Sequence, residues 1–325
     1  TVDFGEGAEQ FTLTVGSTAS NIQGGSGNDT FVVNTSDLMT ASSIVGGAGN
    51  DSVSLGVVLS GNSIRGGNDH DTLRFAAGVN NGAIVSGDAG SDLLLFSSTV
   101  AAAGVYGGGD GDSMVFAGAI SNSTIDFGAG NDSVTFSVAL TNNTIQGGSG
   151  ADTFVFNTAV SSNYIYAGVG DDTLRFSAGV NNNSIVSGDA GSDLLVFSST
   201  VATAAVYGAT GADTLTFAGA ISNSTIDFGL LADLATFSGA ISAQTSIRGG
   251  GGQDTLDFGD ISVDATSIAG GDAADLFTGG ISVGSSGVSF WGGAGADTFN
   301  FTSGITNSAG TAYFWNADAG TDSIN

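Results

Sequence analysis

The sequence lacks cysteine, proline and lysine altogether. Without cysteine, neither disulfide bonds nor thiolate metal sites can form. Catalysis through a thiol or a lysine Schiff base is excluded as well. The single histidine, His70, lies in the turn-like stretch from Gly67 to Asp71, and we interpret it as a solvated variant of that turn. No serine–histidine triad can be assembled around it, so the sequence predicts a protein that is not an enzyme.

Positive charge is scarce. Four arginines stand against 31 acidic residues, and the formal net charge is −27. An acidic excess of this size disfavours nucleic acid and anionic membranes as partners and favours metal cations. No apolar run reaches the length of a transmembrane helix, because glycine, serine, asparagine or aspartate interrupts every one. We therefore expect neither nucleic-acid binding nor membrane insertion.

Glycine, in contrast, is abundant, and it recurs in a fixed pattern. The chain has 55 glycines, and an acidic residue closes a glycine-rich turn every 20 to 22 residues until a last step of 25. A regular period of this length is the signature of a repeat architecture that grows in one dimension. The acidic residues of this row are Glu9, Asp29, Asp51, Asp71, Asp92, Asp112, Asp132, Asp152, Asp172, Asp193, Asp213, Asp233, Asp254, Asp275, Asp297 and Asp322.

The residues between successive aspartates repeat too. After Asp132, apolar residues follow at Val134, Phe136, Leu140 and Ile145, and most periods keep this spacing. The alternation with period two after each aspartate predicts a strand with one buried face. Asparagine and serine gather between the last two apolar rows and predict a second turn. We expect an all-β, parallel β-solenoid of about 15 coils, each with one glycine–aspartate turn.

Two larger features divide the chain. Residues 71–131 and 172–232 match closely at a shift of 101 residues, so five coils were duplicated as a block. We expect a regular solenoid over residues 1–275 and less regular terminal coils over residues 276–325, in a segment of a longer chain. Aromatic residues gather in the terminal region, including Trp291, and indicate either a larger local core or a contact surface.

The glycine turn resembles a known motif. The pattern Gly-Gly-x-Gly-x-Asp-x-apolar is similar to the nonapeptide of repeats-in-toxin (RTX) proteins, which binds calcium in a parallel β-roll. Clean copies begin at Gly24, Gly46, Gly147 and Gly292. The resemblance implies Ca²⁺ as the bound ion and the closing aspartates as ligands. The implied metal residues are these four glycines with Asp29, Asp51, Asp71, Asp92, Asp112, Asp132, Asp152, Asp172, Asp193, Asp213, Asp254 and Asp297.

This sequence departs from the RTX pattern, and its coil is longer than in that family. In that family both edges of the β-roll carry calcium turns, whereas here the glycine turn alternates with an asparagine–serine turn. We therefore expect a single row of calcium sites. Carboxylates stacked about 4.8 Å apart repel by about 0.9 kcal/mol per neighbour even in water, and a cation between turns would reverse that sign. The alternative is that each aspartate only caps its own turn. Glu9, Asp233 and Asp275 are the weakest candidates.

These features favour a structural role. We expect a calcium-stabilised extracellular rod at the bacterial cell surface that self-associates with identical subunits or adjoining repeats in a surface layer or filament. The alternatives are an RTX adhesin stalk, a module that binds a cell-surface glycan, and a polysaccharide-modifying β-helix enzyme. Ice binding is not expected, because the residue after the glycine pair varies (Ser26, Ala48, Asn68, Ala129) and forms no threonine row.

Overall fold

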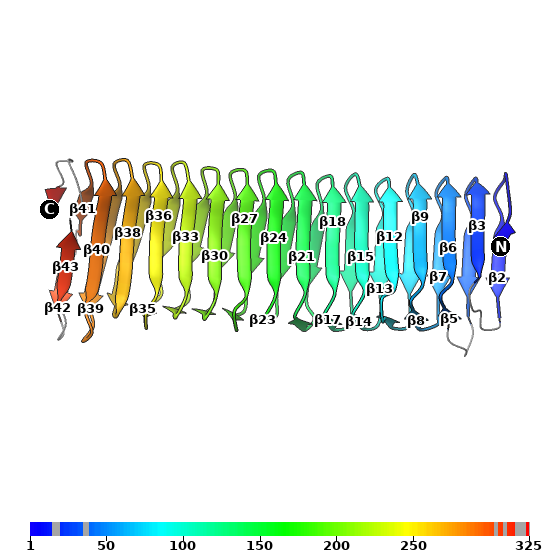
Figure 1. The fold of residues 1–325 in the computed structure, drawn as a ribbon, viewed down its shortest axis with the longest axis horizontal. Coiled ribbons are helices and arrows are strands. Elements are labelled where there is room, and N and C mark those ends of the chain that lie inside the picture. The colour runs from blue at the N-terminus through cyan, green and yellow to red at the C-terminus, as the bar shows by residue number, and fades with distance from the viewer. Residues whose placement is uncertain (15–19, 35–38, 302–304, 308–310, 316–322, 325) are drawn as a thin grey trace. The chain divides into compact units, whose positions relative to one another are not determined.

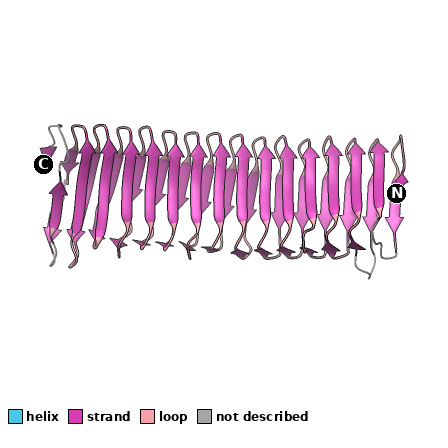
Figure 2. Cartoon of the chain, viewed as in Figure 1, coloured by secondary structure: helices cyan, strands magenta, loops and turns pink. Residues whose placement is uncertain are grey.

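The computed structural model describes residues 1–14, 20–34, 39–301, 305–307, 311–315 and 323–324. Every regular element among them is a strand, which confirms the predicted all-β class (Figure 2). The strands form a parallel β-solenoid of about 15 turns (Figure 1). The chain comprises two compact units, Thr1–Thr158 and Ala159–Asn325. No segment of the described residues forms a helix that could span a membrane.

In the first unit, the longest strands of successive coils pair in parallel to form one sheet. They are β1 (Val2–Asp3), β3 (Asn21–Ser26), β6 (Ser43–Ala48), β9 (Ser63–Asn68), β12 (Ile84–Ala89), β15 (Gly104–Gly109), β18 (Thr124–Ala129) and β21 (Thr144–Ser149).

A second set of parallel strands follows the glycine turns of this unit. They are β2 (Gln10–Leu13), β4 (Thr30–Val33), β7 (Ser52–Leu55), β10 (Thr72–Phe75), β13 (Leu93–Phe96), β16 (Ser113–Phe116), β19 (Ser133–Phe136) and β22 (Thr153–Phe156). The short strands that complete the coils are β5 (Met39–Thr40), β8 (Leu59–Ser60), β11 (Val79–Asn80), β14 (Val100–Ala101), β17 (Ile120–Ser121) and β20 (Leu140–Thr141).

The second unit repeats this anatomy. Its long strands are β24 (Tyr164–Val169), β27 (Ile185–Ala190), β30 (Ala205–Thr210), β33 (Thr225–Leu230), β36 (Ser246–Gly251), β38 (Thr266–Asp272), β40 (Val288–Ala294) and β43 (Ala312–Trp315). The strands after its glycine turns are β25 (Thr173–Phe176), β28 (Leu194–Phe197), β31 (Thr214–Phe217), β34 (Leu234–Phe237), β37 (Thr255–Val263), β39 (Leu276–Val283), β41 (Thr298–Asn300) and β44 (Ser323–Ile324). Its short strands are β23 (Val160–Ser161), β26 (Val180–Asn181), β29 (Val201–Ala202), β32 (Ile221–Ser222), β35 (Ile241–Ser242) and β42 (Ile305–Asn307).

The core consists of the predicted apolar rows. In the coil of Asp132, the side chains of Val134, Phe136, Leu140 and Ile145 are all buried. Phenylalanines of successive coils stack face to face, as Phe197 and Phe217 do with ring centroids 4.9 Å apart. Like residues therefore lie above like residues, which keeps the turns of neighbouring coils in register.

Each regular coil contains three strands, where the sequence pattern predicted two. The predicted first strand breaks after its phenylalanine, and the next buried aliphatic begins a separate two-residue strand, as Leu140 does in β20. The period-two pattern continues across this break, so spacing alone could not reveal it. In β37 and β39 the break is lost and one long strand remains. The predicted boundary at residue 275 stays a prediction.

The second turn satisfies its own polar groups. Asn122 and Asn142 adopt left-handed backbone there, as expected for asparagine. The buried Asn143 accepts a hydrogen bond of 3.0 Å at Oδ1 from the backbone N–H of Ser123 and donates through Nδ2 to the carbonyl of Ile120. Because these side chains cap backbone groups of neighbouring coils, this edge is held by hydrogen bonds within the protein.

Candidate calcium-binding turns

The glycine turn has one backbone geometry throughout the described coils. We number its residues 1 to 6, ending with the aspartate, so that Gly147 is position 1 and Asp152 is position 6. Positions 2 and 4 take positive φ, +107° at Gly148 and +126° at Gly150. Glycine reaches this region without steric cost. Where it is replaced, the residue keeps the geometry, as Leu231 does at φ +79°.

Close stacking gives glycine a second role at these positions. A Cβ atom on Gly148 would overlap the carbonyl oxygen of Gly128, and one on Gly150 would overlap that of Gly130. The carbonyl oxygens at positions 2 and 4 therefore face the next turn along the stack. The glycine edge presents backbone oxygens between successive turns, which is the ligand type that hard cations prefer.

The closing aspartates form a hydrogen-bonded ladder. In each step, the backbone N–H of one aspartate donates to Oδ1 of the aspartate one coil further along the chain. In the first unit this ladder runs from Glu9 to Asp152, with distances of 2.6 to 2.8 Å. In the second unit it runs from Asp172 to Asp297, with distances of 2.7 to 2.9 Å. Oδ1 therefore has a defined structural partner.

The second carboxylate oxygen has no such partner. Within the described part of the chain, Oδ2 of the following residues is buried and accepts no hydrogen bond: Asp29, Asp51, Asp71, Asp92, Asp112, Asp132, Asp193, Asp213, Asp233, Asp254 and Asp275. An uncompensated buried carboxylate oxygen is strongly unfavourable when it carries charge. Oδ2 is thus the atom of the turn that a cation would compensate.

A carbonyl oxygen of the next coil lies beside Oδ2. A Cβ atom built on Gly24 would overlap both Asp29 Oδ2 and the carbonyl oxygen of Gly46. The same pair of oxygens flanks Gly46, Gly87 and Gly188, each with its own aspartate and the following turn. Position 1 is usually glycine because a side chain would fill a space that two oxygens of adjacent coils approach.

Burial raises the pKa of several closing aspartates, among them Asp71, Asp112 and Asp233. The pKa of Asp112 rises to about 8 and that of Asp71 to about 7, in each case chiefly because burial disfavours the charged form. Hydrogen bonds from the backbone lower both values, and neighbouring carboxylates raise them further. The same causes raise the pKa of Asp233 to about 8. Without a cation, these three carboxyl groups are therefore held near the boundary between their protonated and charged forms at neutral pH.

The donor set of this edge fits calcium. Ca²⁺ takes about six to eight oxygen ligands and mixes carboxylates with backbone carbonyls. No group of three or more histidine, cysteine, aspartate or glutamate side chains converges within the described residues, so carboxylates alone cannot complete a coordination shell here. Oδ2 of each closing aspartate and the carbonyl oxygens of the stacked turns are the atoms that would hold the ion. The ion would supply the positive charge that the buried ladder lacks.

The predicted metal residues all lie on this edge. Every aspartate proposed from the sequence belongs to the ladder, and Gly24, Gly46, Gly147 and Gly292 occupy position 1 of their turns. Asp233 and Asp275, the weakest candidates, have the same hydrogen bonds and the same buried Oδ2 as the others. Asp233 and Asp275 keep the regular spacing of the aspartate row, and this spacing was the sequence signal for them, because their turns have lost glycines. Asp322 lies outside the described residues.

Glu9 and His70 also have defined places in the turns. The backbone N–H of Glu9 donates to Asp29 Oδ1, so this glutamate begins the ladder. His70 occupies position 5, where its Nδ1 accepts a hydrogen bond of 3.0 Å from the backbone N–H of Ser91. Asn50 accepts from the N–H of His70 in the same way one coil earlier. The histidine therefore replaces asparagine in a turn ladder.

Comparison with known proteins identifies the repeat. The RTX calcium-binding nonapeptide repeat (4 copies) matches residues 12–35, 41–57, 140–157, 161–182 and 284–305. The chain is thus a parallel β-solenoid. The matched stretches are RTX calcium-binding nonapeptide repeats, and Ca²⁺ is the ion that such repeats bind. Repeats of this type are typical of secreted bacterial proteins.

One solved structure covers most of the chain. It is the X-ray crystal structure of a hyperactive, Ca²⁺-dependent, β-helical antifreeze protein from an Antarctic bacterium. The two chains share 19% sequence identity with a TM-score of 0.48, over 84% of this chain and 83% of that one. No match was found among curated proteins.

Proposed function

We propose that this chain is a structural, calcium-stabilised segment of a secreted bacterial surface protein, and that it self-associates in a surface layer or filament. The observation that supports the proposal most directly is the ladder of buried aspartates, repeated from coil to coil. A catalytic or ligand site is one constellation, whereas here the same turn recurs along both units. One buried carboxylate and one bound ion in each coil would stabilise a long stack of coils.

The calcium requirement supports an extracellular location. Calcium outside cells is abundant enough to fill weak sites, whereas cytosolic calcium is kept low. A solenoid whose buried carboxylates need the ion would fold after secretion and stay unfolded before it, because metal binding and folding are coupled. The RTX character of the repeats agrees with this location.

Outward apolar side chains support self-association. Val115 is 49% exposed on β16, and Leu234 is 42% exposed on β34. Leu95 and Val155 occupy the position of Val115, three residues after the closing aspartate, and are half-buried. Apolar side chains arranged along one face of a repeat protein offer a surface that a second copy can cover.

A non-catalytic role agrees with the turn chemistry. The closing aspartates are committed to the ladder, and His70 holds the N–H of Ser91. The polysaccharide-modifying enzyme considered from the sequence would need its catalytic acids outside this ladder. We therefore favour the structural function over that alternative.

Electron microscopy and sedimentation of the purified chain, with calcium and after chelation, test this proposal. We expect ordered assemblies with calcium and loss of both assembly and β-sheet circular dichroism without it. Val115→Lys should weaken assembly while leaving the melting temperature unchanged, whereas Thr124→Lys on the other sheet is the matched control. Dispersed monomers under both conditions would contradict self-assembly, and an unchanged spectrum after chelation would contradict the calcium role.

A further inference from the structure

A row of mostly aromatic and charged side chains crosses the outer face of the long-strand sheet in the second unit. Its members occupy one register position on successive strands, β30, β33, β36, β38 and β40. In order, they are Tyr207, Asp227, Arg248, Ala269 and Trp291. We refer to them as the Arg248 row. Over these five strands the row has an aromatic residue at each end and two opposite charges between them, and its register position continues on β43 at Trp315.

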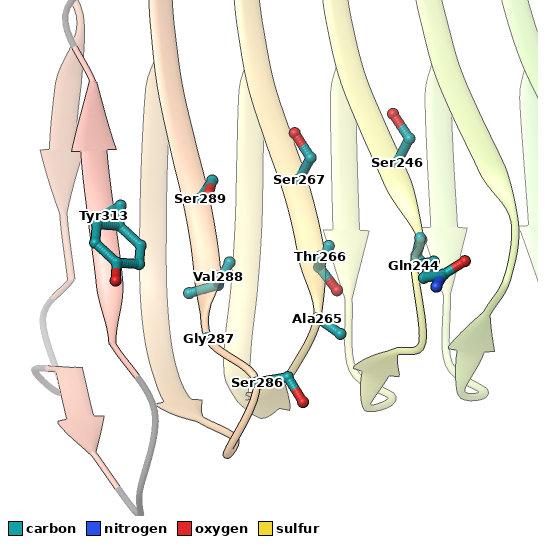
Figure 3. A pocket seen from close by; sticks show the side chains of 11 residues that line it. Gln244, Ser246, Ala265, Thr266, Ser267, Ser286, Gly287, Val288, Ser289 and Tyr313 are labelled. Atoms are coloured by element: carbon teal, nitrogen blue, oxygen red, sulfur yellow. The ribbon is translucent and has the colours of Figure 1, made fainter.

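A second row runs beside the first, two residues earlier on each strand. Its members are Thr225, Ser246, Ser267, Ser289 and Tyr313. Figure 3 shows Ser246, Ser267 and Ser289 on successive strands, with the ring of Tyr313 beyond them. We refer to this set as the Ser246 row. It offers hydroxyl groups along one side and a further aromatic ring at the end.

The two rows line adjoining hollows. One has a volume of about 560 Å³ and is lined by the Arg248 row with Thr225, Ser246 and Ser267. The other has a volume of about 330 Å³ and is lined by members of the Ser246 row with Gln244, Thr266 and Ser286 (Figure 3). Ser246 and Ser267 line both hollows, so the two hollows form one groove across the strands.

The side chains of the groove are accessible. Trp291 is 39% exposed and Tyr313 is 51% exposed, although tryptophan side chains are highly buried on average. Ala269 is the smallest member of its row and opens the space between Arg248 and Trp291. Arg248 and Asp227 lie on neighbouring strands, yet they form no ion pair within the described residues, whereas Arg65 pairs with Asp88 at 3.1 Å.

We propose that this groove binds a neutral polysaccharide chain. A pyranose ring has an apolar C–H face that can stack on Trp291, Tyr313 or Tyr207, and hydroxyl groups at its edge. Asp227 accepts hydrogen bonds from two hydroxyls, and Arg248 donates several in a fixed plane. The serine and threonine hydroxyls complete a surface that is polar at its base and aromatic at its ends. Four strand spacings, about 19 Å, separate Tyr207 from Trp291, so the groove accepts several sugar units.

Charge favours a neutral saccharide over an acidic one. The net charge of −27 repels polyanions, and Asp227 lies within the groove itself. The site does not depend on the proposed assembly role, because its residues lie within the second unit alone.

The first unit contains an internal control. Tyr106 and Asp126 occupy neighbouring strands β15 and β18 and are the counterparts of Tyr207 and Asp227 at the 101-residue shift of the duplicated block. The next member is Gln146 in the first unit and Arg248 in the second. The change Arg248→Gln therefore restores the residue that the first unit has at this position.

The test uses the full, calcium-loaded chain carrying Trp315→Phe, so that Trp291 is the remaining tryptophan. Maltohexaose, cellohexaose and laminarihexaose are titrated with calorimetry and tryptophan fluorescence as readouts. We expect at least one to bind and to shift the Trp291 emission. Trp291→Ala and Arg248→Gln should each weaken binding about tenfold, whereas Tyr106→Ala should leave it unchanged.

Three results would overturn the proposal. One is the absence of binding by all three oligosaccharides at millimolar concentration while circular dichroism shows the calcium-loaded fold. Another is an equal effect of Tyr106→Ala and Trp291→Ala. The third is tighter binding of trigalacturonate than of every neutral probe, which would assign the groove to acidic saccharides. Arg248→Gln changes an exposed side chain, so this variant stays informative if Trp291→Ala fails to fold.

Discussion

The backbone N–H of Asp92 donates a hydrogen bond of 2.8 Å to Oδ1 of Asp112, one coil further along the chain. Oδ2 of Asp112 is buried without a hydrogen-bond partner in the described part of the chain. The two oxygens of one carboxylate thus have separate tasks: Oδ1 joins neighbouring coils, and Oδ2 is left for a cation. A turn cap alone would need only the first of these.

Replacement of Asp112 by asparagine separates these tasks. The amide oxygen can keep the bond to Asp92, while the amide nitrogen would lie beside the carbonyl oxygen of Phe127. With calcium at 100 times its Kd, we expect Asp112→Asn to lose about 2.7 kcal/mol of stabilisation. Without calcium, the same variant should be more stable than the wild type, because it removes a buried charge. Thermal melting in both conditions measures this reversal.

Ser113→Ala is the matched control for Asp112→Asn, because Ser113 is the exposed neighbour on β16. It should change the melting temperature little in either condition. If Asp112→Asn behaves like this control in calcium, the aspartate serves only as a turn cap and the cation has no role at this turn.

The stability of the metal-free protein should fall as the pH rises. The pKa of Asp112 rises in the folded state from an ordinary value of 3.8 to about 8, chiefly because of burial. A group with a raised folded-state pKa stabilises the fold below its unfolded pKa, and that contribution is lost as pH rises through the folded value. The melting temperature of the chelated protein should therefore decrease between about pH 4 and pH 8.

Calcium should invert this pH dependence, because the ion binds the deprotonated carboxylate. In excess calcium, melting temperature should increase with pH over the same range. Parallel melts at several pH values, with and without the ion, give both slopes. A chelated protein that becomes more stable as the pH rises would contradict the account of a buried, uncompensated ladder.

Leu231 and Leu230 form a natural pair for testing turn strain. Both are exposed, at 62% and 56%, but Leu231 takes φ +79° at a turn position where glycine is usual. Left-handed backbone costs a residue with a side chain about 1–2 kcal/mol. Leu231→Gly should therefore stabilise the calcium-loaded protein by about 1 kcal/mol.

Leu230→Gly should instead destabilise the protein, by up to about 1 kcal/mol, because it places glycine in strand β33 without relieving strain. The two variants remove the same side chain from adjacent exposed positions. Melting temperatures that shift in the same direction would show that lost apolar surface, and not backbone strain, sets their stability.

Residues equivalent to Asp132, Phe136 and Ile145 recur in most periods, together with the glycines before each aspartate. This recurrence was enough to predict the coil, its buried rows and its glycine edge. The break between Phe136 and Leu140 could not be predicted, because both residues obey the same period-two pattern and only backbone pairing separates their strands. The groove could not be predicted from the sequence for a related reason. Tyr207 and Trp291 fall in one row through the register of five strands, which depends on the length of every intervening coil.

The separate roles of Oδ1 and Oδ2 within each carboxylate could not be predicted from the sequence either. The sequence placed Asp112 at the end of a turn and left open whether it caps the turn or binds an ion. Only the stacking of turns shows that Oδ1 is occupied by Asp92 N–H while Oδ2 faces a carbonyl oxygen of the next coil.

The number of calcium ions bound per chain at neutral pH, measured by equilibrium dialysis with metal analysis, tests the central claim most directly. If every rung of the buried ladder shares a cation with its neighbours, the count should approach one ion for each aspartate from Asp29 to Asp297. It should decrease in proportion as ladder aspartates are replaced by asparagine. A chain that folds with no calcium, or with one or two ions whose number does not respond to these replacements, would contradict it.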